Sequence, residues 1–143
     1  MKVKIKRLDK TLPMPKYHTK GSTAFDFYAV NNEIIKPNEL KMILTNFIIK
    51  TPPGYMLMII PRSSLGLKKG LEFVNSAGII DQDFCGEDDK IHIFVRNFNK
   101  KKVLIERGER IAQGIFVKIA VASWQEAEKM NRKNRGCWGS TGK

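Results

Sequence analysis

The sequence predicts an all-β domain, a sandwich or a barrel, and three observations support this fold class. Short apolar or alternating runs recur along the chain, and turn residues such as Pro52, Pro53 and Gly54 separate them. No long segment repeats with the 3.6-residue period of a helix. Apolar residues make up 42% of the 143 residues, which is enough for one hydrophobic core and excludes a disordered chain.

The expected strands follow from the apolar runs. The run at residues 3–8 alternates polar and apolar side chains, and the run at residues 24–30 is rich in aromatic rings. Residues 40–49 and 55–60 are apolar enough for strands that are buried on both faces. The remaining expected strands are residues 91–95, 103–105 and 111–121, and the two helix candidates are residues 63–69 and 123–130.

The charge and the cysteine content of the sequence limit which binding partners and which cellular location are expected. Lys and Arg number 26 against 14 Asp and Glu, and the formal net charge of +12 favours anionic partners. The lysines are scattered and lack the aromatic pattern of an RNA-binding surface, so a solvated surface without stable nucleic-acid binding is the first interpretation. Cys85 and Cys137 cannot form a disulfide framework, and residues 1–8 lack a signal-peptide core. We therefore expect a cytoplasmic protein without a membrane span, with nuclear or organellar forms left open.

The C-terminal residues 131–143 differ in composition from the rest of the chain. Glycines, basic residues and one large aromatic residue, Trp138, occur there without an apolar run that could pack as a strand. Two parts are therefore expected, a β-barrel domain at residues 1–130 and a flexible arm at residues 131–143.

Phosphate-binding chemistry is first indicated at residues 61–66, where a proline ends an apolar run. Arg62 offers a planar guanidinium that suits phosphate. Ser63 and Ser64 offer hydroxyl and backbone N–H groups at the start of a short helix. A serine pair that only caps this helix is the competing interpretation.

A candidate general base lies in residues 75–87. Asp81 follows two apolar residues, and a carboxylate at the end of an apolar run is expected to be partly desolvated and directed, as a base requires. A solvated hairpin turn is the alternative, and it is the interpretation that we adopt for the other acidic residues of the segment. These are Asp83, Glu87, Asp88 and Asp89.

Two later segments complete the set. Residues 108–116 follow a turn, and residues 135–142 combine Arg135, flexible glycines and the hydroxyls of Ser140 and Thr141, which suits the cradling of phosphate. This arm is not a Walker loop, because the Gly-Lys-Ser/Thr order is absent and no helix follows.

Taken in order and spacing, five segments resemble the motifs of the trimeric dUTPase family and span residues 23–142. They are Thr-Ala-Phe-Asp-Phe at 23–27, Pro-Arg-Ser-Ser-Leu at 61–65, residues 78–87 with Asn75 upstream, Gly-Glu-Arg-Ile-Ala-Gln at 108–113, and Arg-Gly-Cys-Trp-Gly-Ser-Thr-Gly at 135–142.

The resemblance implies a distorted jelly-roll-like β-barrel, a homotrimer with shared active sites, and hydrolysis of dUTP to dUMP and pyrophosphate. This reaction keeps uracil out of DNA and supplies dUMP for dTMP synthesis. Asp81 is implied as the base that activates a water for in-line attack on the α-phosphorus. The implied Mg²⁺ is held by the phosphates and water, and Asp26 supports that side through hydrogen bonds without ligating the metal.

The resemblance also assigns substrate contacts along the chain. The residues implied to bind the triphosphate are Arg62, Ser63, Ser64, Gln113, Arg135, Ser140 and Thr141. The residues implied to contact the uracil edge are Asn75, Gly78, Ile79 and Ile80. Phe84 is implied to contact the sugar, and Trp138 and Gly139 belong to the closing arm.

Four positions depart from the family pattern. Ala24 replaces a glycine and Phe27 a leucine, so local packing differs. Phe84 replaces the tyrosine under the deoxyribose, and its ring can still exclude a 2′-hydroxyl. Trp138 replaces the phenylalanine that stacks on uracil, and its larger face retains the stacking.

Other functions remain open at this point. A dCTP deaminase or a bifunctional relative shares the barrel but lacks the full closing arm. A basic nucleic-acid-binding β domain is suggested by charge alone, and it would show a steep dependence of affinity on salt. A regulatory protein that binds partners through the same scaffold is a third alternative.

Overall fold

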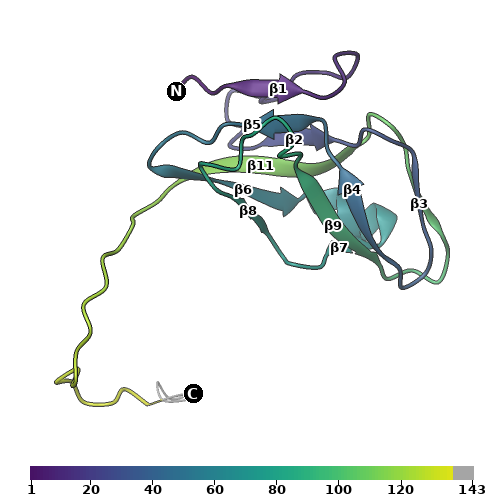
Figure 1. Cartoon of the computed structure of the whole chain (residues 1–143). Helices are drawn as coiled ribbons and strands as arrows, with labels where there is room; N and C mark the ends of the chain where they lie inside the picture. The colour runs from purple at the N-terminus through teal and green to yellow at the C-terminus, as the bar shows by residue number, and fades with distance from the viewer. Residues whose placement is uncertain (137–143) are drawn as a thin grey trace.

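Antiparallel strands account for nearly all regular structure in the computed structural model, which describes residues 1–136 (Figure 1). One short helical turn, η1 (Leu65–Lys69), interrupts them. The strands are β1 (Ile5–Arg7), β2 (Phe25–Tyr28), β3 (Glu33–Ile35), β4 (Leu40–Leu44), β5 (Phe47–Ile49), β6 (Tyr55–Pro61), β7 (Leu71–Phe73), β8 (Gly78–Ile80), β9 (His92–Asn97), β10 (Val103–Ile105) and β11 (Arg110–Lys118).

The strands form two main antiparallel sheets around one core. The first contains β2, β11, β6 and β8 in that spatial order, and the second contains β4, β9 and β7. Two further pairs, β1 with β5 and β10 with β3, complete the body of the molecule (Figure 1). An isolated bridge between Ala29 and Thr45 links the segment after β2 to the end of β4. The predicted all-β fold is confirmed.

Aromatic rings fill the core next to the first sheet. Phe27 and Phe47 are fully buried, and their ring centroids lie 5.6 Å apart in an edge-to-face arrangement. Gly114 of β11 faces these rings, because a Cβ placed there would lie 2.6 Å from the ring of Phe27 and 2.9 Å from that of Phe25. A side chain at residue 114 would therefore push β11 away from the core, and with it the neighbouring residues of this strand.

The long apolar run at residues 40–49 is two strands, not one. β4 and β5 are separated by Thr45 and Asn46, which are both buried. The Thr45 hydroxyl donates to the carbonyl of Ile91 at 2.7 Å, so this buried hydroxyl between the two strands has a hydrogen-bond partner inside the protein. The prediction that this run is buried on both faces is wrong for β4, where Met42 is 63% exposed. The short strands β3 and β7 were not predicted.

The two helix candidates have different outcomes. Residues 63–69 are helical, and the turn ends at Gly70, whose φ of 61° is left-handed. Residues 123–130 form no helix, so that prediction is wrong. The exposed fraction of Trp124 is 94%, and a helix this short is marginal in water when no surface packs against it.

The chain leaves the barrel at the end of β11. Residues 119–136 contain no strand or helix and run away from the body (Figure 1). The predicted division at residue 130 remains a prediction. Within residues 1–136, no helix is long and apolar enough to cross a membrane.

Candidate active site

A buried carboxylate with three basic neighbours organises one end of the first sheet. Asp26, on β2, is only 6% exposed. Its Oδ1 lies 3.0 Å from Nε of Arg62, and its Oδ2 lies 2.8 Å from Nε2 of His18 and 3.3 Å from Nη1 of Arg110. A buried carboxylate is costly unless it is paired and hydrogen-bonded, and Asp26 meets both conditions within a single chain.

Strand register brings these groups together. β11 lies between β2 and β6, so Gln113 is opposite Asp26 on one side and Ile60 on the other. The side-chain amide of Gln113 donates to the carbonyl of Pro61 at 3.1 Å, and Arg62 donates from Nη1 to the carbonyl of Arg110 at 3.2 Å. The motifs at residues 23–27, 61–65 and 108–113 therefore meet at one end of the first sheet, and their roles in substrate binding stay predictions.

A pocket of about 560 Å³ opens beside this cluster. Ser64, which lines it, makes no side-chain hydrogen bond to cap the helical turn, so simple capping does not explain this residue. Burial, and secondarily the Asp26 carboxylate, raises the pKa of the Tyr28 phenol, which keeps a neutral hydroxyl at the wall. The lining residues are Pro13, Lys16, His18, Tyr28, Arg62, Ser64, Leu65, Lys68, Lys69, Gly108, Glu109 and Arg110.

This pocket can bind an anion with several negative oxygens. Guanidinium and ammonium groups line it, and a single acidic lining residue, Glu109, is already paired with Lys69 at 2.7 Å. Arginine forks and hydroxyls are the groups that bind phosphate in proteins. Of the basic residues that line the pocket, Arg62 was predicted as a site residue, whereas Lys16, His18, Lys68, Lys69 and Arg110 were not.

The predicted base lies elsewhere. Asp81 directly follows β8 and is exposed, so the partial desolvation expected from the sequence is not present in the single chain. The uracil candidates Gly78, Ile79 and Ile80 form β8 itself, an edge strand of the first sheet. Asn75 lies in the turn before β8 and Phe84 in the loop after it.

Asp81 and the anion pocket lie at opposite ends of β6. Antiparallel pairing sets Ile80 opposite Leu57, whereas Arg62 follows the last residue of β6. Five residues separate positions 57 and 62, a distance of about 17 Å at roughly 3.4 Å per residue. A single chain therefore does not bring Asp81 to the pocket.

The remaining predicted residues belong to the C-terminal arm. Arg135 is exposed beyond the barrel. Trp138, Gly139, Ser140 and Thr141 lie outside the described residues, as does Cys137. Cys85 is a free thiol, and its Sγ lies 3.7 Å from the carbonyl of Gln82.

Sequence reasoning missed His18 and Arg110 as partners of Asp26. Arg110 lies within the motif at residues 108–113, so the motif itself was the available signal. His18 carried no signal, because an isolated histidine in a loop has no spacing that connects it with a carboxylate on β2.

Comparison with known proteins identifies the family. The model of the dUTPase family matches residues 10–142. The chain belongs to the dUTPase family. A deoxyuridine 5'-triphosphate nucleotidohydrolase of Hydrogenobaculum sp. is 39% identical over 99% of both chains, and one of Nautilia profundicola is 37% identical over the full length of both.

Solved dUTPase structures share the fold. The dUTPase of Staphylococcus bacteriophage 80alpha with dUPNHPP superimposes with a TM-score of 0.85 at 23% identity, over 99% of this chain and 98% of that one. The dUTPase of Streptococcus mutans has a TM-score of 0.76 at 24% identity, over 84% of this chain and 98% of that one. The predicted jelly-roll-like barrel and the resemblance to the dUTPase family are both confirmed.

Proposed function

We propose that this dUTPase-family chain is a dUTP diphosphatase, which hydrolyses dUTP to dUMP and pyrophosphate. The observation that carries the proposal is the anion pocket beside Asp26, because two of the family's motifs line it and a third places Asp26 against its Arg62 and Arg110, in a chain that matches the family model over residues 10–142. The reaction removes dUTP from the pool available for DNA synthesis and yields dUMP for dTMP synthesis.

The pocket takes the triphosphate in this proposal. Asp26 fixes Arg62 through Oδ1, so the guanidinium is oriented before substrate arrives. Ser63, Ser64 and Gln113 add hydrogen-bond donors at the same end of the first sheet. The closing arm contributes Arg135, Gly139, Ser140 and Thr141.

The nucleoside lies along β8. This strand pairs only with β6 among the described strands, so its other edge carries backbone N–H and C=O groups that can read the uracil edge as a pairing base would. Asn75 supplies a side-chain amide next to that edge. The ring of Phe84, which is 39% exposed, packs against the sugar, and Trp138 stacks on the uracil.

Asp81 is the general base of the proposed reaction. Its carboxylate accepts a proton from a water as the water oxygen bonds to the α-phosphorus. The bond from that phosphorus to the bridging oxygen breaks, and the electron pair leaves with pyrophosphate. The exposure of Asp81 supports a site that closes only when other elements cover it.

Magnesium fits this site as an ion carried by the substrate. Within residues 1–136, no cluster of three His, Cys, Asp or Glu side chains could hold a metal ion, and both oxygens of Asp26 face cationic groups. Mg²⁺ prefers several waters and phosphate oxygens to a full set of protein ligands. When bound, it supplies charge neutralisation on the phosphates, and Asp26 supports that side by fixing Arg62 and Arg110.

A homotrimer with shared active sites accounts for the separation of Asp81 from the pocket. If each site takes its base from one chain and its pocket from another, the distance of about 17 Å along β6 is no obstacle. The exposed apolar residues Val121, Trp124 and Met130 in the C-terminal segment support assembly, because they need a surface to pack against. The cytoplasmic location and the lack of stable nucleic-acid or membrane binding stay part of the proposal.

Pyrophosphate release tests the function directly. dUTP, dCTP, dTTP and UTP are compared side by side with magnesium, and release from dUTP is expected to exceed that from the other three clearly. A preference for dCTP, or no release from any nucleotide, would overturn the proposal.

A further inference from the structure

A lysine-rich groove lies next to the triphosphate pocket and belongs to no dUTPase motif. Lys68 and Lys69 come from η1, and Lys100, Lys101 and Lys102 come from the loop between β9 and β10. The groove has a volume of about 610 Å³. Two lysine runs that lie 30 residues apart in sequence thus gather on one surface, which the sequence alone did not indicate.

Buried hydrogen bonds hold the loop in place. The side chain of Asn97, fully buried, donates from Nδ2 to the carbonyls of Ile35 and Lys101, both at 2.9 Å. Its Oδ1 accepts from the backbone N–H of Asn99 at 2.9 Å, and Asn99 in turn donates to the carbonyl of Lys69 at 2.6 Å. The loop is thereby tied to η1, so its three lysines project from a fixed base.

Most of this charge is uncompensated. Lys69 is paired with Glu109 at 2.7 Å. Among residues 1–136, no ion pair involves Lys68 or any of the three lysines of the loop. The loop lysines and Lys68 are all exposed. Like charges gathered on a concave surface repel one another, and a bound or passing anion relieves that repulsion.

The groove is continuous with the triphosphate pocket. Lys68 and Lys69 line both cavities, so an anion that enters the groove meets the pocket without crossing a neutral surface. A concave surface of one sign of charge focuses the field and raises the local concentration and the association rate of a ligand of opposite sign.

We propose that this groove is a capture surface for the triphosphate of the substrate, which steers the nucleotide into the adjoining pocket. The inference rests on the proposed function for the identity of the nucleotide. The groove affects how fast substrate arrives and does not take part in the bond-breaking step.

The test is the association rate constant of a non-hydrolysable dUTP analogue, followed by stopped-flow tryptophan fluorescence. The triple variant Lys100→Gln, Lys101→Gln and Lys102→Gln is compared with the unchanged protein at ionic strengths of about 0.01 M and about 0.15 M, where the Debye length is about 30 Å and about 8 Å. At low ionic strength, we expect the variant to associate about three- to tenfold more slowly. At high ionic strength, the difference in association rate between the variant and the unchanged protein becomes smaller. The dissociation rate constant of the variant equals that of the unchanged protein at both ionic strengths.

A matched variant separates the groove from total charge. Lys4 and Lys50 line another basic pocket, which shares no lining residue with the triphosphate pocket, and Lys2 is exposed near them in sequence. Conversion of Lys2, Lys4 and Lys50 to glutamine removes the same number of charges and is expected to leave the association rate nearly unchanged. Equal slowing in both triple variants, or no slowing in either, would overturn the proposal.

Inorganic triphosphate separates this inference from the proposed function. Calorimetric titration at low ionic strength is expected to give at least about threefold weaker binding for the loop variant than for the control variant, because the groove recognises phosphate charge and not the base. If the loop variant binds triphosphate more weakly than the control variant, but the unchanged protein does not bind the dUTP analogue, the proposed function is wrong and the groove still captures triphosphate. If the loop variant binds triphosphate as well as the control does, the groove is not a capture surface.

Discussion

The two halves of the proposed site lie at the two ends of β6, and they differ in whether the carboxylate at that end is buried. At one end, Asp26 is buried and contacts Arg62, His18 and Arg110 within the chain. At the other end, Asp81 is exposed next to an edge strand. The phosphate half of the proposed site is thus organised within one chain, whereas residues 1–136 leave the proposed base open to solvent.

This difference follows from the charges involved. A cluster of arginines that binds phosphate has to be held apart and oriented before the ligand arrives, and a buried carboxylate at its centre provides that support. A general base needs instead to reach a water on a bound substrate, so it can stay solvated until the site closes. The comparison predicts large activity losses with small changes in stability at the Asp81 end, and changes in both at the Asp26 end.

The largest effect is expected for Asp81→Asn. The amide keeps the size of the side chain but cannot accept a proton, so dUTP turnover should fall by about 10²–10⁴-fold. Binding of a non-hydrolysable analogue and the melting temperature should change little, because Asp81 is exposed. Asp83→Asn, two residues away, is the control. Turnover of Asp81→Asn within about tenfold of the unchanged protein would remove Asp81 from the base role.

A smaller loss of activity, joined to a loss of stability, is expected for Asp26→Asn. The substituted amide group turns an N–H toward one of the three donors, so one charge-assisted contact is lost and Arg62 is less well oriented. We expect kcat/KM to fall by about tenfold or more, and stability by about 1.5–3 kcal/mol, the usual range for a hydrogen bond to a charged group. Steady-state kinetics and denaturant unfolding measure the two, and Asp88→Asn is the exposed control. Loss of activity without loss of stability would contradict the supporting role of Asp26.

A change in selectivity, with modest loss of dUTP activity, is expected for Phe84→Ala. The ring follows Asp81 by three residues and packs against the sugar in the proposed function, so its removal is expected to leave room for a 2′-hydroxyl. The ratio of UTP to dUTP hydrolysis should rise, and side-by-side kcat/KM values measure it. An unchanged ratio would assign the rejection of ribose to another group.

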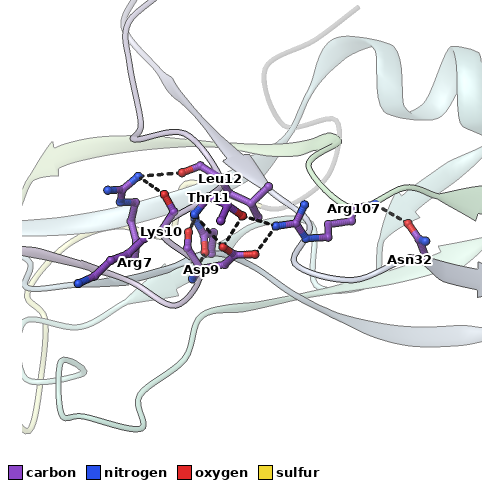
Figure 2. A network of polar contacts seen from close by, with 8 residues as sticks. Arg7, Asp9, Lys10, Thr11, Leu12, Asn32 and Arg107 are labelled. Atoms are coloured by element: carbon purple, nitrogen blue, oxygen red, sulfur yellow. Dashed lines mark hydrogen bonds and ion pairs between the residues drawn. The ribbon is translucent and has the colours of Figure 1, made fainter.

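The smallest effect concerns a polar contact outside the site. Asp9 accepts hydrogen bonds from Thr11 and Arg107, and Arg107 also donates its backbone N–H to Asn32 (Figure 2). The hydrogen bond from the Thr11 hydroxyl, followed by that from Arg107, lowers the pKa of Asp9 from 3.8 to about 2. The charged form is therefore favoured in the folded state, and its contribution is complete above pH 3.8 and is lost as pH falls through about 2.

Acid unfolding of Asp9→Asn measures this contribution. The variant should be slightly less stable than the unchanged protein at neutral pH, and the difference should disappear as pH falls from about 4 to about 2. The effect is small, since water surrounds this ion pair and screens it. A difference that persists unchanged to pH 2 would show that the carboxylate charge is not its cause.

Much of the fold was predictable from the sequence because it depends on local patterns. Apolar runs located most strands, and the motif at residues 61–65 correctly marked a strand end followed by a helical turn. The break at Thr45 and Asn46 was not predictable, because both side chains satisfy their polar groups with distant residues such as Ile91. Residues 123–130 have a helix-like start, but no surface within residues 1–136 covers them.

The site divides in the same way. The resemblance to the family grouped Asp26, Arg62 and Gln113 on the phosphate side, and the structure brings their motifs together on the neighbouring strands β2, β11 and β6. Their contact with phosphate stays a prediction. The contact of His18 with Asp26 was not predictable, because it depends on how a loop folds over β2. The exposure of Asp81 also escaped prediction, since the burial of a residue after a strand depends on what packs against the edge of the sheet.

Mixed assemblies test the shared site most directly. Asp81→Asn and a truncation that ends at Asn134 should each be inactive alone, the first without a base and the second without the closing arm. In trimers formed from equal amounts of the two chains, a site that takes its base from a truncated chain and its arm from an Asp81→Asn chain is intact. Random mixing makes this combination in about a quarter of all sites, and every trimer that contains both chains holds it in one site of three, so purified mixed trimers should recover about a third of the activity of the unchanged protein. Mixed trimers that remain as inactive as either parent would contradict a site that takes its base and its closing arm from different chains.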